Sequence, residues 1–249
     1  RRLAYRFFDF VDLHRYIRFQ DAIAVLDERD KEWVARYYGM RATVVRSGID
    51  ANAFQFQVRL MPTQSRLKLL TVGIFFRHRR FEDILAAITL LRAKGVDATL
   101  DIVGNDTTDL SYAREIRSLV ASRGLTSVVH LRGVLSDDEL RRAYKEADAF
   151  VFASHLQSWG LAVFEAIASG LPVIVSKTAG ASEVLRDGET ALLVPPKDGA
   201  AIARACERLL TEQGLSEKLS RSGRSFVEHK LSWGRYADAM TTLFTGRNQ

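Results

Sequence analysis

The sequence has few residues that could build a covalent or metal scaffold. Its 249 residues include a single cysteine, Cys206, and only four prolines. One thiol can form neither an internal disulfide nor, by itself, a zinc site, so a disulfide-stabilised scaffold is excluded. Cys206 lies in the apolar helical pattern AIARACERLL, and we expect it to be a buried core residue.

Long hydrophobic runs are also missing. The longest, such as residues 171–175, are far shorter than the roughly 20 apolar residues that cross a bilayer. No secretory pattern opens the chain, and we expect no transmembrane segment. With 47% hydrophobic residues, the chain is long enough to bury the core of one or two globular domains.

The charge balance favours anionic partners. The formal net charge is +6 and the sequence pI is about 9.6, which suits phosphate-bearing ligands, nucleic acid or an anionic membrane surface. Aromatic residues and arginines are not interleaved on one predicted strand or recognition helix, and no base-reading motif is present. We therefore expect no nucleic-acid partner.

Short β-branched segments alternate with amphipathic ones over most of the chain. The expected strands are residues 68–73, 98–104, 127–133, 149–154, 172–176 and 191–194. The expected helices between them are residues 81–95, 111–124, 136–148, 160–170 and 181–188. This order predicts an α/β fold with a doubly wound, Rossmann-like parallel sheet, whose ligands bind at the carboxyl ends of the strands.

The first sixty residues follow the same order in a shorter form. We expect a helix over residues 3–19, a strand over 22–27, a helix over 28–39 and a strand over 42–48. That is half of a nucleotide-fold domain. Residues 50–66 lack periodicity and contain a proline, which indicates a connection between two units.

Glu165 is an unexpected acid within the apolar run SHLQSWGLAVFEAIASGLPVIVS. The predicted helix begins near Gly160, so the amides of Gly160 and Leu161 would be open at its N-terminus and suited to phosphate. A carboxylate one and a half turns further on could accept hydrogen bonds from both hydroxyls of a ribose. The alternative is an ordinary solvated or amide-bonded glutamate on an amphipathic helix.

The run from residue 157 to residue 196 resembles the signature of retaining glycosyltransferases with two Rossmann domains, the GT-B group often called family 4. That signature has two glutamates separated by seven residues. Glu165 matches the second, which the resemblance implies holds the nucleotide ribose. Gln157 stands in place of the first, so a neutral amide would contact the hydroxyls of the transferred sugar, with Ser158 beside it.

The segment LLTVGIFFRHRRFEDIL is similar to the strand, glycine and diphosphate loop of the same family. Gly73 matches the glycine, but Ile74 replaces the arginine that usually follows it. The resemblance then assigns the phosphates to Arg79 or Arg80, with a one-residue ambiguity, aided by Arg77. The alternative is that these arginines form a solvated helix start.

Other positions extend the resemblance. Val134 stands where the backbone of the family contacts the base. Ser136 and Glu139 have the spacing of a helix capping box, and we expect that structural role. Glu183 is either a helix-start carboxylate or a sugar-loop residue, and His155 is expected to be a loop histidine rather than a catalyst.

The resemblance implies a domain organisation and an activity. Residues 1–60 would be the end of an acceptor-side N-terminal domain and the start of a linker, 61–230 the nucleotide-sugar-binding domain, and 231–249 a helix returning toward the N-terminal domain. The implied activity is transfer of a sugar from a nucleotide diphosphate-sugar to a saccharide or lipid-linked acceptor, with retention of configuration. The alternative function is a non-catalytic nucleotide-sugar or glycan-binding relative.

We expect no cofactor. The chain contains no Asp-x-Asp motif, so no divalent metal is expected either. The expected location is cytoplasmic. The opening helix is rich in arginine and phenylalanine, so it would either touch an anionic membrane at the cytoplasmic face or pack inside the N-terminal domain.

Overall fold

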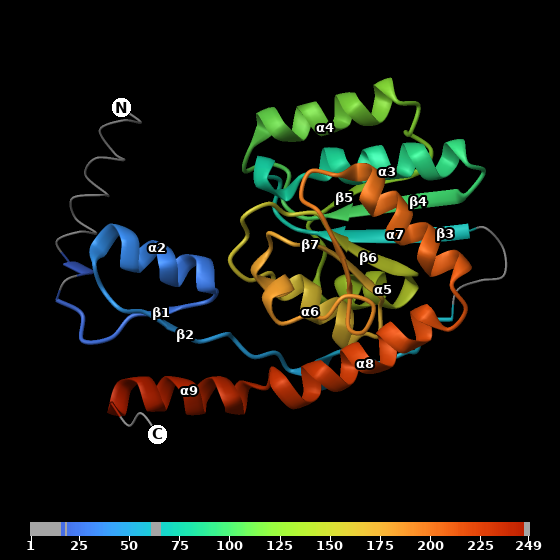
Figure 1. Ribbon diagram of the computed structural model, residues 1–249. Coiled ribbons are helices and arrows are strands. Elements are labelled where there is room, and N and C mark those ends of the chain that lie inside the picture. The colour runs from blue at the N-terminus through green and yellow to red at the C-terminus, as the bar shows by residue number, and fades with distance from the viewer. Residues whose placement is uncertain (1–15, 18, 61–65, 247–249) are drawn as a thin grey trace. The chain divides into compact units, whose positions relative to one another are not determined.

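The computed structural model describes residues 16–17, 19–60 and 66–246. The chain divides into two compact units. One contains the described residues up to Gly48 together with those from Trp233 onward, and the other contains the described residues of Ile49–Ser232 (Figure 1). Residues 49–60 thus belong to the second unit. The predicted helix 3–19 lies almost entirely outside the described residues.

The second unit is built on a six-stranded sheet in which all neighbouring strands are parallel. The strands are β3 (Arg66–Val72), β4 (Asp97–Val103), β5 (Val129–Gly133), β6 (Ala149–Phe152), β7 (Val173–Ser176) and β8 (Leu192–Val194). Their order is β5-β4-β3-β6-β7-β8, which confirms the predicted doubly wound α/β fold. The order reverses between β3 and β6, and ligands of such sheets bind at this topological switch point.

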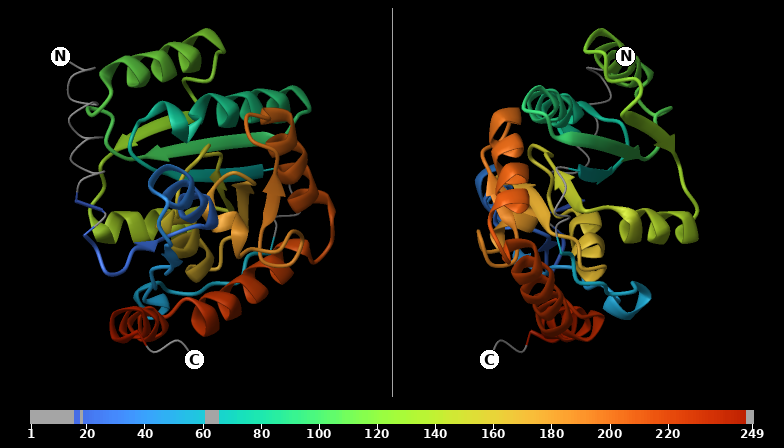
Figure 2. Two further views of the ribbon diagram at one scale, coloured as in Figure 1. Left: turned by 60° about the vertical axis from the view of Figure 1, so that its left-hand side comes forward. Right: turned by 90° about the vertical axis from the view of Figure 1, so that its right-hand side faces the viewer.

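Helices cover both faces of this sheet. They are α3 (Phe81–Ala93), α4 (Leu110–Ser122), α5 (Asp137–Glu146), α6 (Leu161–Ala168), α7 (Gly199–Thr211) and α8 (Leu215–Lys230). Helices α3 and α7 pack on one face, and α5 and α6 lie on the other (Figure 2). Strands covered on both faces carry apolar residues on both sides, and this is clearest in β6 and β7, where every residue is buried.

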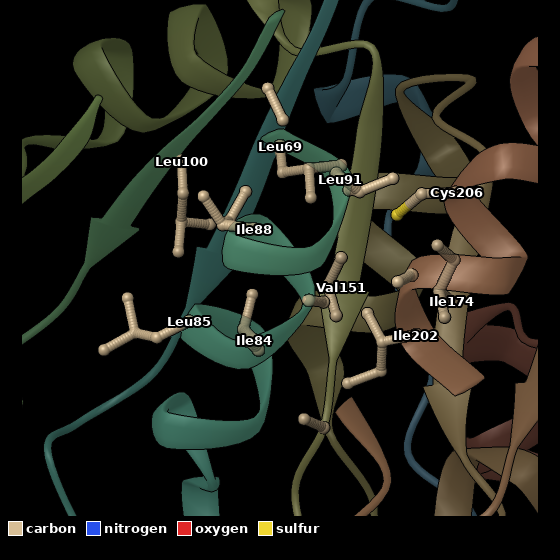
Figure 3. Packing of buried hydrophobic residues seen from close by; sticks show 14 of the residues in the cluster. Leu69, Ile84, Leu85, Ile88, Leu91, Leu100, Val151, Ile174, Ile202 and Cys206 are labelled. Atoms are coloured by element: carbon tan, nitrogen blue, oxygen red, sulfur yellow. The ribbon is translucent and has the colours of Figure 1, made fainter. Parts of the chain in front are cut away.

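The main core lies between the sheet and helices α3 and α7. Leu69, Val151 and Ile174 come from three neighbouring strands and meet helix residues such as Ile88 (Figure 3). Cys206 on α7 is fully buried in the same cluster, which confirms the prediction of a core thiol. Its burial, with a smaller contribution from the neighbouring Glu207 charge, raises the pKa of Cys206 to about 12.

The helix predicted over residues 181–188 was wrong. The chain makes only a short 3₁₀ turn, η3 (Gly180–Glu183), and then a tight loop. The Arg186 amide donates to the Thr190 hydroxyl at 2.8 Å, and the Asp187 carboxylate accepts from the Leu193 amide at 2.8 Å. Side chains therefore take up hydrogen bonds that a helix would have made along its backbone.

The first unit contains a parallel pair of short strands, β1 (Ala24–Val25) and β2 (Thr43–Val44), joined by helix α2 (Glu28–Tyr38). This confirms the predicted strand-helix-strand order. The Asp27 carboxylate caps α2 by accepting from the Asp30 amide at 2.7 Å. Helix α9 (Trp233–Thr245) belongs to the same unit. None of the described helices combines the length and apolarity needed to cross a membrane.

Candidate functional site

Three glycines end the strands on one side of the switch point. Gly73, Gly104 and Gly133 stand at the carboxyl ends of β3, β4 and β5, and the Gly104 amide donates to the Gly133 carbonyl at 2.8 Å. A Cβ on Gly104 would lie 2.0 Å from the Gly73 carbonyl oxygen, and φ of Gly104 is +146°. Only glycine permits this approach of two backbones.

Arg79 lies at the switch point. It ends the 3₁₀ turn η2 (Arg77–Arg79), and its side chain folds back so that a Cβ on Gly73 would lie 3.0 Å from Nε. The Arg79 Cζ is 5.7 Å from the ring centroid of Phe152 on β6. The Nε atom is buried and makes no hydrogen bond with any described residue. Desolvation lowers the pKa of Arg79, but an arginine remains a cation in proteins.

The other two arginines of this segment are engaged elsewhere. Arg80 makes a bidentate pair with Asp83, with both N–O distances at 2.9 Å, and it also pairs with Glu82 at 2.7 Å. These hydrogen bonds raise the pKa of Arg80. Arg77 pairs with Glu115 at 2.7 Å. The geometry therefore favours Arg79, the remaining arginine of the segment, as the one available to an anion.

The loop after β6 is held by contacts with two other loops. The His155 amide donates to the His78 carbonyl at 2.7 Å, and the Gly180 amide donates to the Gln157 carbonyl at 2.7 Å. Gln157 itself is half-buried. Leu156 adopts φ +59°, a left-handed conformation that is uncommon for a bulky residue. Gln157 therefore sits in a tightly defined turn beside η2.

Helix α6 begins where the same loop ends. Gly160 has φ +101°, and a Cβ there would lie 2.9 Å from the ring of Phe152. Leu161 is the first residue of the helix and is exposed, and Ser158 is half-buried just before the turn. The start of a helix presents backbone N–H groups and a partial positive charge, which favour an anion. Phe152 is thus flanked by Gly160 and by the Arg79 guanidinium.

Glu165 is half-buried on α6 and accepts a hydrogen bond from the Tyr144 hydroxyl on α5 at 2.7 Å. Tyr144 is fully buried, and burial together with the neighbouring carboxylate raises its pKa well above the ordinary value. The ring of Phe54 contacts Tyr144 edge-on at 6.0 Å, and the guanidinium of Arg59 donates to the Tyr144 carbonyl at 3.0 Å. The sequence did not point to Tyr144, because it lies 21 residues from Glu165 and has the spacing of an ordinary core residue.

The remaining predicted positions are scattered around this edge of the sheet. Val134 follows Gly133 and is 73% exposed. Ser136 and Glu139 form the predicted capping box, with the Ser136 amide donating to the Glu139 carboxylate at 2.8 Å. Glu183 is exposed at the end of η3. Within the described part of the chain, no group of three or more His, Cys, Asp or Glu side chains could hold a metal ion.

The fold and this edge of the sheet define a doubly wound domain of the class that binds anionic ligands at its switch point. Within that class, the glycosyl transferases group 1 family matches residues 56–226, and the chain belongs to this family. The predicted family resemblance and the GT-B architecture are confirmed.

Sequence and structural relatives agree with this assignment. Glycogen synthase from Mycobacterium tuberculosis is 31% identical over 81% of this chain and 48% of its own length. The structure of a sucrose-phosphate synthase from Thermosynechococcus elongatus superimposes with a TM-score of 0.82 and 25% identity, over 95% of this chain and 61% of that one. An Anabaena protein solved with UDP and glucose has a TM-score of 0.80 at 14% identity, over 92% and 64% of the two chains, and shares the fold. The chain thus spans about half the length of the curated glycogen synthase that it matches.

Proposed function

We propose that this chain is the donor-binding part of a glycosyltransferase that moves a sugar from a nucleotide diphosphate-sugar to a saccharide or lipid-linked acceptor, with retention of configuration. The observation that carries the proposal is the position of Arg79. Its guanidinium is folded against Gly73 and beside Phe152, at the switch point of the sheet, with Nε buried and without a hydrogen-bond partner among the described residues.

Each candidate residue has a task that suits its chemistry. A guanidinium offers a planar fork of donors to phosphate, and the start of α6 offers backbone amides at Leu161, so both would stabilise the negative charge that grows on the leaving diphosphate. Glu165 would accept a ribose hydroxyl with the carboxylate oxygen that Tyr144 does not occupy. Gln157 would hold hydroxyls of the transferred sugar, and the backbone at Val134 would contact the base.

A second function is supported by two departures from the family pattern. Ile74 is 42% exposed where an arginine is usual, and Gln157 is neutral where a glutamate is usual. A non-catalytic nucleotide-sugar-binding protein would tolerate both replacements. Turnover by a longer protein that includes the acceptor-side region would contradict this alternative, whereas nucleotide-sugar binding without turnover would support it.

The decisive experiment is calorimetric titration of the 249-residue chain with UDP, GDP and ADP and with the matching nucleosides. We expect one diphosphate to bind more tightly than its nucleoside, and Arg79→Ala to weaken that diphosphate by about 10- to 100-fold, because charge-assisted hydrogen bonds contribute about 1.5–3 kcal/mol. Arg77→Ala is the matched control, since Arg77 pairs with Glu115, and it should change the affinity by less than about threefold. Failure of all three diphosphates to bind would refute the proposal.

A further inference from the structure

Arg59 is a buried arginine to which the proposed function assigns no task. It lies in the connecting segment, residues 49–60 before β3, and is only 6% exposed. Its guanidinium donates to four backbone carbonyls. They belong to Tyr144 at 3.0 Å, Lys145 at 3.0 Å, Ala147 at 3.1 Å and Gln57 at 3.0 Å. Three of these four carbonyls lie at the C-terminal end of α5, so the buried cation is bound to that helix end.

An arginine suits the end of a helix for two reasons. The last carbonyls of a helix have no partner within it, and they carry a partial negative charge that favours a cation. A guanidinium is always charged and has five N–H donors in a rigid planar fork. Because this fork bonds three carbonyls of α5 at once, it fixes where the helix end lies as well as satisfying its free acceptors.

Tyr144 is the residue that this arginine shares with the candidate site. Its carbonyl accepts from Arg59, and its hydroxyl donates to the Glu165 carboxylate at 2.7 Å. Its ring also meets the ring of Phe54, another residue of the connecting segment, edge-on at 6.0 Å. The segment therefore holds Tyr144 at both its backbone and its ring.

The connecting segment also reaches the end of α6, the helix that carries the carboxylate. The Gln57 amide donates to the carbonyl of Ser169, which directly follows α6, at 3.2 Å. Arg224 on α8 donates to the carbonyl of Phe54 in the segment at 3.3 Å and to that of Ala168, the last residue of α6, at 2.6 Å. One segment thus fixes the ends of both helices between which the tyrosine–carboxylate hydrogen bond forms.

Resting on the proposed function, we propose that Arg59 is a positioning residue of the ribose site, which holds the end of α5 so that the Tyr144 hydroxyl reaches Glu165. One oxygen of the carboxylate is bonded to a buried hydroxyl, so the other oxygen faces a ribose in one orientation. A carboxylate that is ordered beforehand avoids the entropic cost of ordering it on binding. Arg59 does not contact the nucleotide in this proposal and acts through Tyr144.

The test compares nucleotides with and without ribose hydroxyls. The 249-residue chain and its variants are titrated with UDP, GDP and ADP and with their 2′,3′-dideoxy forms. For the base that binds, we expect Arg59→Met to weaken the ribose form about fivefold or more, as loss of one hydrogen bond does, and the dideoxy form less than about twofold. Arg92→Met is the matched control, at an arginine of α3 that donates to the Ala98 carbonyl at 3.3 Å, and should change neither affinity.

A second variant covers failure to fold. Arg59→Lys keeps the positive charge and most of the stem, but an ammonium donates from a single atom and cannot span three carbonyls as the fork does. We expect it to narrow the preference for the ribose form about threefold. It replaces Arg59→Met if thermal unfolding shows that the methionine variant is not folded at the temperature of the titration.

A double-mutant cycle tests whether the effect passes through the tyrosine hydroxyl. In a Tyr144→Phe background, Arg59→Met should narrow the preference for the ribose form no further. If it still narrows that preference by the full factor, the effect does not depend on the hydroxyl and the positioning role is refuted.

The outcomes also distinguish this inference from the proposed function. If none of UDP, GDP and ADP binds the unsubstituted chain, the proposed function fails and this inference fails with it. If a nucleotide binds equally well with and without its ribose hydroxyls, the ribose site and its positioning residue are refuted while nucleotide binding stands. If Arg59→Met weakens both forms equally, or neither, Arg59 is purely structural and the inference alone is refuted.

Discussion

Replacing Tyr144 by phenylalanine removes a single hydroxyl from the support of Glu165. The hydroxyl donates to the Glu165 carboxylate at 2.7 Å, and Tyr144 is fully buried. The ring contacts with Phe54 and Phe150, at 6.0 Å each, do not involve the hydroxyl and should persist. The substitution therefore tests the hydrogen bond with little change in packing.

The magnitude follows from the charge and exposure of the acceptor. A hydrogen bond to a charged group contributes about 1.5–3 kcal/mol, and the half-buried Glu165 can recover part of this from water, so we expect the free energy of unfolding to fall by about 1–2 kcal/mol. A carboxylate that is no longer oriented should also bind a ribose less well. We expect nucleotide affinity to fall about 5- to 10-fold, which corresponds to about 1–1.4 kcal/mol.

Urea denaturation and titration with the nucleotide that the parent chain binds measure the two effects. The matched control is Tyr112→Phe, since Tyr112 is also fully buried and its hydroxyl donates to Glu82 at 2.6 Å, on α3. That variant should lose stability but retain nucleotide affinity. If Tyr144→Phe lowers stability while nucleotide affinity is unchanged, Tyr144 is purely structural and Glu165 does not depend on it for binding.

Two further predictions concern stability. Gly104→Ala should lower the free energy of unfolding by about 3 kcal/mol or more, because a Cβ would lie 2.0 Å from the Gly73 carbonyl oxygen. The control is Gly124→Ala, at a glycine with φ +66° and no atom within 4 Å of the added Cβ, which should cost only about 1–2 kcal/mol. Urea denaturation measures both, and equal costs would contradict the close approach of the two backbones. Alkaline pH should also destabilise the chain, because Cys206 ionises only at about pH 12 when folded and near its ordinary pKa of 9.0 when unfolded. The contribution of the buried Cys206 thiol to stability is complete below about pH 9 and then falls by about 1.4 kcal/mol per pH unit. Cys206→Ala should therefore flatten the decline of the unfolding free energy between pH 9 and 12. An identical decline in the parent chain and the variant would refute this cause.

The sequence by itself determined the elements and their order. Period-two and period-3.6 patterns reflect local backbone geometry, so all six strands of the main sheet and most of the helices could be predicted, and right-handed crossover rules then led to a parallel doubly wound sheet. The buried position of Cys206 followed from the same periodicity. Glu165 also stood out from the sequence, as a lone acid in an apolar run at a fixed spacing from the start of its helix.

Only the tertiary structure decided which side chains meet. Arg79 and Arg80 are neighbours in the sequence, and the choice between them depends on η2, which turns one toward Gly73 and the other toward Asp83. The pairing of Tyr144 with Glu165 depends on how α5 and α6 lie on the sheet.

The hydrogen bond from the His155 amide to the His78 carbonyl likewise joins two loops that lie far apart in the sequence and are brought together by the adjacent strands β3 and β6. Periodicity records which face of an element is buried, but it carries no information about partners in distant segments. Those partners are set by strand order, by register and by a few backbone conformations such as the left-handed one at Leu156.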